Sequence, residues 1–231
     1  MPDISKINNV AVADISKLDS ITFADGQKVN NQSVSLISDA HTLIDTADSG
    51  SGVASLGFTS GIDSTYDVYE FHFTNIHPET NNVNFLFQVN PSDDEVGSGT
   101  GEYDTSPITS TFMTSYQKED NADAHPSAGF LYEADQDIAN VANYVPLNLH
   151  VAAAVGDESL SGVLRLFAPH SNTFVKHFMS DTNVYTNGDY SRRALVAGYI
   201  NDTTPITQIN FKFASDEIQG GNIKMYGVAK S

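Results

Sequence analysis

Two stretches, Tyr69-Glu70-Phe71-His72-Phe73 and Val83-Asn84-Phe85-Leu86-Phe87-Gln88-Val89, decide the fold that the sequence predicts. In both, a large apolar side chain recurs at every second residue, and a turn-rich segment at 78–82 separates them. Successive side chains of a strand point to opposite faces of a sheet, so this period of two predicts two β-strands, each with one buried face.

The same pattern continues to the end of the chain, in short segments bounded by Gly, Pro, Asn, Asp or Ser. The strands expected there are Ile108–Tyr116, Gly129–Glu133, Leu147–Val155, Val163–Phe167, Phe174–Met179, Leu195–Ile200, Ile206–Phe213 and Ile223–Val228. One short exception, Gln136–Asn143, could form a helical turn. Many short strands separated by turns predict an all-β protein, an antiparallel β-sandwich that is jelly-roll-like.

An eleven-residue repeat occupies the N-terminus, where Ile4–Asp14 and Ile15–Asp25 are identical at five of eleven positions. A third, decayed copy keeps Lys28-Val29-Asn30-Asn31 in step. This period fits a right-handed helical supercoil, but the paired Asn residues, Gly26 and the β-branched residues favour short extended segments instead. We therefore expect an extended N-terminal arm.

The arm is too short to bury its own apolar side chains, so we expect it to order against a partner. The expected docking residues are Ile4, Ile7, Val10, Ile15, Leu18, Ile21, Phe23 and Val29. Ser49-Gly50-Ser51-Gly52 has the composition of a linker. The sequence thus predicts an anchoring arm (1–45), a Ser/Gly-rich linker (46–64) and a β-sandwich domain (65–231).

Composition restricts the function classes. The chain has 231 residues and a formal net charge of −18, with 11 Lys and Arg against 29 Asp and Glu. Such an acidic chain repels phosphate backbones, so no nucleic-acid partner is expected. No run of about 18 apolar residues occurs, so no membrane insertion is expected either. Cysteine is absent, which excludes disulfides and thiolate metal sites.

Motifs for catalysis or metal binding are missing. The sequence has no His-Glu-x-x-His, no Gly-x-Ser-x-Gly and no phosphate-binding glycine loop, so we expect no enzyme, no catalytic residue, no cofactor and no metal. Loop carboxylates at Asp93-Asp94-Glu95 and at Glu119-Asp120 with Asp123 could bind Ca²⁺. Their spacing does not match the twelve-residue calcium loop, and we interpret them as solvated acidic groups.

Tyrosines in or near loops form the candidate ligand-binding set. Exposed aromatic side chains in sandwich loops bind sugars or proteins, and they also cap the ends of cores, so both interpretations stay open. The set is Tyr103, Tyr116, Tyr132, Tyr144, Tyr185 and Tyr190. The cations Lys176, Arg192 and Arg193 could pair across a subunit boundary or form surface ion pairs.

Several phrases of the C-terminal part resemble a known family. They are Phe73-Thr74-Asn75-Ile76-His77-Pro78, Gly162–Pro169 with Ser171–Phe178, Ala197-Gly198-Tyr199, Ile206–Phe213 and Gly220–Gly227. These phrases and the Ile-Ser-Lys-Ile-Asn-Asn-Val repeat resemble virion structural proteins of tailed phages, especially those that infect marine bacteria. The resemblance covers most of the chain and carries over no catalytic residue.

The resemblance implies a non-enzymatic virion protein that assembles with other virion proteins and forms a homo-oligomer, as particle proteins commonly do. The arm would dock to the particle and the β-domain would be exposed, in a tail or fibre component in preference to a capsid decoration protein. The alternative is a receptor- or carbohydrate-binding module that contacts a host-surface glycan. A hydrolase of surface glycans ranks third.

Overall fold

The computed structural model describes residues 41–93, 103, 106–120, 124–125 and 130–228, together with residues 6–7, 10–11, 28–29 and 32–33. The chain divides into two compact units, Met1–Thr42 and Leu43–Ser231. In the first unit, β1 (Lys6–Ile7) pairs antiparallel with β2 (Val10–Ala11), and β3 (Lys28–Val29) pairs antiparallel with β4 (Gln32–Ser33). Of the expected docking residues, Ile4, Ile15, Leu18, Ile21 and Phe23 lie outside the described residues.

The described part of the remaining chain is built from strands and one 3₁₀ helix. The strands form one 14-stranded sheet whose pairs are all antiparallel, and the all-β prediction is confirmed. They are β5 (His41–Asp48), β6 (Leu56–Phe58), β7 (Val68–Pro78), β8 (Val83–Pro91), β9 (Ile108–Lys118), β10 (Ala124–His125), β11 (Leu131–Tyr132), β12 (Ile138–Val141), β13 (Val145–Val151), β14 (Leu160–Phe167), β15 (Lys176–Thr186), β16 (Tyr190–Ile200), β17 (Ile206–Phe213) and β18 (Ile218–Val228).

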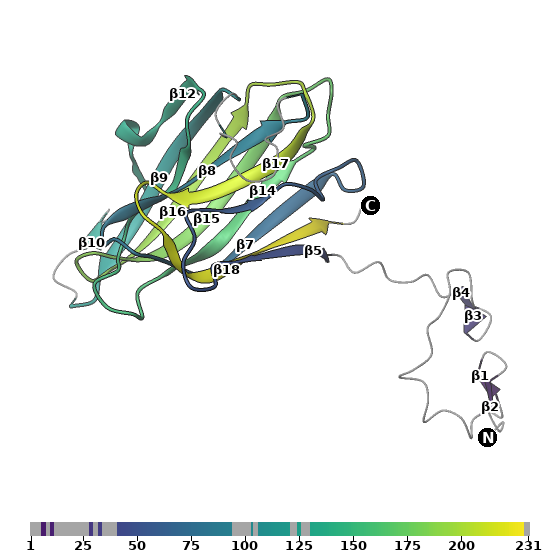
Figure 1. Ribbon diagram of the computed structural model, residues 1–231, viewed down its shortest axis with the longest axis horizontal. Coiled ribbons are helices and arrows are strands. Elements are labelled where there is room, and N and C mark those ends of the chain that lie inside the picture. Colours follow the sequence, from purple (N-terminus) through teal and green to yellow (C-terminus); the bar gives the residue numbers. More distant parts are fainter. Residues whose placement is uncertain are drawn as a thin grey trace. The chain divides into compact units, whose positions relative to one another are not determined.

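The sheet nearly closes on itself (Figure 1). Its longest path runs β5-β18-β7-β14-β15-β13-β8-β17-β6. At β15 the sheet branches, because β15 also pairs with β16, and β16 in turn pairs with β9 along its whole length. The short strands β10, β11 and β12 all pair with β9. Strands far apart in the sequence therefore enclose one interior.

Aromatic side chains from several strands fill that interior. The rings of Phe73 and Phe211 lie 5.1 Å apart, and those of Phe87 and Phe178 lie 4.9 Å apart, centroid to centroid. Each of these rings is at most 3% exposed. Burying a phenylalanine stabilises the fold by roughly 1.5–3 kcal/mol. The alternating aromatic residues of β7 and β8 thus help to build the core.

Two segments differ from their sequence prediction. Residues 46–64, expected to be a linker, supply the end of β5 and all of β6, and Leu56, Phe58 and Ile62 are buried in the core. These three residues lie among Gly and Ser, so composition hid them. The segment Gln136–Asn143 is not a helical turn, because the 3₁₀ helix η2 spans Ala134–Gln136 and the chain then pairs with β9 as β12.

None of the helices in the described residues has the length and apolar character required to cross a membrane.

Candidate functional site

A pocket lies beside β9 and β15, where the inward face of β16 changes from apolar to polar. In β16 the inward side chains of Val196 and Ala194 are buried, and the same face continues to Arg192 and Tyr190. Strand pairing places Arg192 opposite Tyr116 of β9, and Tyr190 opposite Thr186 of β15. The pocket has a volume of about 610 Å³, within the usual range for small-ligand sites.

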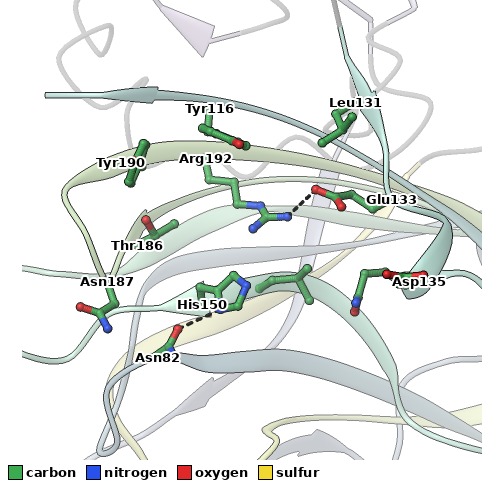
Figure 2. Close-up of a pocket in the computed structure, with 12 residues that line it drawn as sticks. Asn82, Tyr116, Leu131, Glu133, Asp135, His150, Thr186, Asn187, Tyr190 and Arg192 are labelled. Atoms are coloured by element: carbon green, nitrogen blue, oxygen red, sulfur yellow. Dashed lines mark hydrogen bonds and ion pairs between the residues drawn. The ribbon is translucent and has the colours of Figure 1, made fainter. Parts of the chain in front are cut away.

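Arg192 and Glu133 form the central ion pair of the pocket (Figure 2). The Nη2 of Arg192 donates to Oε1 of Glu133 at 3.0 Å, and the same oxygen accepts a hydrogen bond from Thr114 Oγ1 at 2.8 Å. Arg192 is only 8% exposed. Burial lowers the pKa of its guanidinium, while Glu133 and Tyr116 act in the opposite direction. Arginine stays charged nevertheless, so the pocket contains a permanent donor beside a carboxylate.

His150 and Asn82 form a second polar pair on the pocket wall. The Nδ1 of His150 and Oδ1 of Asn82 lie 2.8 Å apart. Burial lowers the pKa of His150, Arg192 lowers it further, and Glu133 partly opposes both effects. The lowered pKa favours the uncharged imidazole, and in the tautomer that donates from Nδ1 to the amide oxygen, Nε2 is an acceptor.

Both members of this second pair have left-handed backbone conformations. The φ angle is 66° at Asn82 and 59° at His150. Residues other than glycine rarely adopt this region, and such strain concentrates at functional sites. The backbone around them is held by hydrogen bonds from Asn82 N to Val151 O at 2.9 Å and from Asn187 N to His150 O at 3.3 Å. The polar wall is therefore tied to neighbouring main chain by hydrogen bonds.

Tyr116 and Tyr190 are the two predicted ligand-binding tyrosines that line the pocket. Their ring centroids lie 5.5 Å apart with an interplanar angle of 89°, an edge-to-face contact. Lys118 Nζ lies 6.0 Å from the centroid of the Tyr190 ring. Figure 2 shows both tyrosines with Arg192 and Thr186, on β9, β15 and β16.

The other four predicted tyrosines lie elsewhere. Tyr132 is 56% exposed and its hydroxyl donates to Asp137. The hydroxyl of Tyr185 donates to Asp189 at 3.0 Å, and this bond is the main cause that raises the pKa of Tyr185 to about 12.

Tyr144 contacts polar side chains, and the hydroxyl of Tyr103 is buried. Tyr144 donates to Asn210 at 3.0 Å beneath Lys212, whose Nζ lies 4.1 Å from the ring centroid. Burial raises the pKa of Tyr103, whose hydroxyl is shielded from solvent. Neither tyrosine lines the pocket, and both interpretations of their role stay open.

The three cations singled out in the sequence make contacts within the chain. Lys176 is fully buried, and its ammonium donates to the main-chain oxygen of Asp202 at 3.0 Å and to that of Thr204. Arg193 pairs with Asp181 on the neighbouring strand β15. Pairing across a subunit boundary is therefore not needed to satisfy these side chains.

Sequence reasoning missed most of the polar residues of the pocket. Asn82, Glu133, His150 and Arg192 come from segments up to 110 residues apart, and no short motif contains them. One signal was present for Arg192. It stands two and four residues before Ala194 and Val196, so the period of two places it on the buried face of the same strand.

Among the described residues, no cluster of three or more His, Asp or Glu side chains could hold a metal ion. Of the acidic loop residues considered for Ca²⁺, Asp94, Glu95 and Asp123 lie outside the described residues.

Chemically, the pocket combines aromatic rings with alternating hydrogen-bond donors and acceptors. One oxygen of the Glu133 carboxylate accepts hydrogen bonds from Arg192 and Thr114. Comparison with protein-family models, with curated proteins and with solved structures found no match.

Proposed function

We propose that this chain is a non-enzymatic structural protein of a phage virion. Its N-terminal arm docks to other virion proteins, and its β-domain is exposed on the particle. The observation that carries the proposal is the division of the chain into a repeat-bearing unit, Met1–Thr42, and a compact β-unit, Leu43–Ser231. An arm laid along neighbouring subunits buries apolar area at about 25 cal/mol per Å², less the cost of ordering it.

The strand pairs of the arm support a repeated docking unit. The pair β1–β2 and the pair β3–β4 begin at Lys6 and Lys28, which are 22 residues apart, or two periods of the repeat. In both, two asparagines separate the strands in the sequence. Asparagine tolerates the positive φ angles of tight hairpin turns. Equivalent hairpins would present equivalent surfaces to equivalent partners, as in symmetric assemblies.

We also propose that the β-unit is a jelly-roll-like sandwich. The strands β13, β8, β17 and β6 form one continuous run of the sheet, joined to β15 through the single pair Val151↔Thr186. Rings from this run contact rings from the other strands, as in Phe87 with Phe178 and Phe211 with Phe71. Contacts of this kind are typical of two packed layers.

In the experiment, the codons for residues 1–40 are deleted from the gene. The amount of the truncated chain in purified virions is then measured by mass spectrometry. We expect the β-unit to stay folded and soluble and to be lost from the particle. Normal incorporation of the truncated chain would refute the docking role. Gold labelling of the intact chain in virions then distinguishes a tail or fibre position, which we favour, from capsid decoration.

A finer variant replaces Ile7, Leu18 and Val29 together by Asp. These residues occupy the same position in the three copies of the repeat, so their loss should abolish incorporation without changing the melting temperature of the β-unit. Asp157→Asn, in an exposed loop after β13, is the matched control and should incorporate normally.

The pocket favours a second function for the exposed domain, recognition of a host-surface carbohydrate. Tyr116 and Tyr190 converge there with the Arg192–Glu133 pair, and aromatic rings beside fixed polar groups are the usual composition of saccharide sites. Binding of the full chain to immobilised host surface polysaccharide would support this function, and absence of binding to every glycan presented would refute it.

A further inference from the structure

The arrangement of charge in the pocket identifies the class of ligand, given the carbohydrate-binding role proposed above. The residues of charged type that line it are Arg192, Glu133 and Asp135, and their formal charges sum to −1. The lowered pKa of His150 favours its uncharged form. The whole chain carries −18. An acidic sugar would enter against this field, whereas an uncharged one would not be repelled.

The ion pair at the centre offers a donor and an acceptor side by side. Arg192 donates one N–H group to Oε1 of Glu133, and the same oxygen accepts a hydrogen bond from Thr114. The guanidinium carries five N–H groups, and the second carboxylate oxygen can accept further bonds. Adjacent hydroxyl groups of a sugar, each both donor and acceptor, match such a pair.

Further polar groups lie around this centre at positions set by strained backbone. Nε2 of His150 is an acceptor, and the ring orientation is held by Asn82 at 2.8 Å. Thr186 and Asn187 add a hydroxyl and an amide at the end of β15. Because the conformations of Asn82 and His150 are already in place, binding does not have to order them.

The remaining lining is apolar or aromatic. Tyr116 and Tyr190 contribute rings, and Leu131 and Leu149 contribute aliphatic groups. The C–H face of a pyranose ring packs on such surfaces while its hydroxyls bond to polar groups, so both parts of the lining are used by one ligand.

We infer that this pocket binds an uncharged saccharide. Tyr116 and Tyr190 contact the apolar face of the sugar ring, and the Arg192–Glu133 pair bonds to neighbouring hydroxyl groups. Acidic sugars, sialylated or uronic, are discriminated against.

The test measures binding of the full chain to two matched glycan sets on one array, with calorimetry for the best binders. One set holds neutral hexose and N-acetylhexosamine glycans, and the other holds sialylated and uronic-acid glycans. We expect binding in the neutral set. Binding confined to acidic glycans would overturn the inference while leaving a carbohydrate-binding role in place. Binding to neither set overturns both, and neither result bears on docking of the arm to the virion.

Variants then place the ligand in this pocket. Tyr190→Ala and Asn187→Ala, both near the rim, should weaken neutral-glycan binding, the former by about tenfold, as expected for loss of about 1.4 kcal/mol of ring contact. Tyr185→Ala is the matched control, because Tyr185 lies on the outward face of β15 and should bind normally. Unchanged affinity in both pocket variants, with folding verified by circular dichroism, would overturn the assignment to this pocket.

Discussion

The buried ion pair of the pocket allows a quantitative prediction about Glu133→Ala. This change leaves the Arg192 guanidinium, whose side chain is 10% exposed, without its carboxylate. It also removes the acceptor of Thr114, which is fully buried. Removing one partner of a buried pair costs about 3–5 kcal/mol. The Glu133 side chain is 25% exposed, which weakens the interaction. We therefore expect a loss of about 3 kcal/mol in the free energy of unfolding.

The assay is urea unfolding followed by circular dichroism and tyrosine emission. The chain has ten tyrosines and no tryptophan, so tyrosine emission is not masked. For a chain of this size each kcal/mol lowers the melting temperature by about 2–4 °C, so the expected decrease is about 6–12 °C. The slope of the unfolding free energy against urea should not change, because the same surface is exposed on unfolding.

A double-mutant cycle separates the pair from other effects. Arg192→Met removes the charge and keeps much of the side-chain volume. The double variant leaves no unpaired charge buried. Its decrease in the free energy of unfolding should therefore be smaller than the sum of the decreases in the two single variants, by about 1–3 kcal/mol. A loss below about 0.5 kcal/mol for Glu133→Ala, or strict additivity in the cycle, would refute the buried-pair reasoning.

Three further predictions concern single positions, each checked by unfolding measurements. The pKa of His150 is lowered from 6.5 in the folded chain, so the unfolded chain takes up the proton first as pH falls. The contribution of His150 to the free energy of unfolding should therefore be constant above about pH 7 and decrease below about pH 6.5. The variant His150→Gln should reduce that decrease. Gly198→Ala would place a Cβ against the main-chain oxygen of Thr109 and 2.9 Å from the Phe178 ring, and it should cost about 1–3 kcal/mol, whereas Gly156→Ala, with nothing within 4 Å, should be neutral. Lys176→Met should cost about 1–3 kcal/mol, because two carbonyl groups after β16 lose their donor; a neutral result would contradict the contact described.

The strands that the sequence predicted well are those whose signal is local. Strand β17 spans Ile206–Phe213 as predicted, and β7 and β8 contain the alternating aromatics that were read from the sequence. The predicted β15 started at Phe174 and stopped at Met179, but the strand continues to Thr186. Its later residues are mostly polar, and they remain extended because β16 pairs with them throughout.

The same distinction explains why β6 and the first part of β16 were missed. Leu56 and Phe58 are buried, yet they lie in a Ser- and Gly-rich stretch that has the composition of a linker. Pairing of β6 with β17 makes this stretch a strand. For Arg192 the sequence left open a pair across a subunit boundary or a surface ion pair, and strand pairing opposite Tyr116 places it on the inward face. For β6, hydrogen bonds from a distant partner outweighed local composition.

By itself the sequence determined the all-β class, the alternation that builds the aromatic core, the repeat in the arm and the acidic charge. Each of these is a property of neighbouring residues or of composition. It also pointed to Tyr116 and Tyr190. Only the tertiary structure decided that these two rings share a pocket with Arg192, Glu133 and His150. The reason is that register between strands is set by pairing across long loops, and it alone decides which distant side chains face one another.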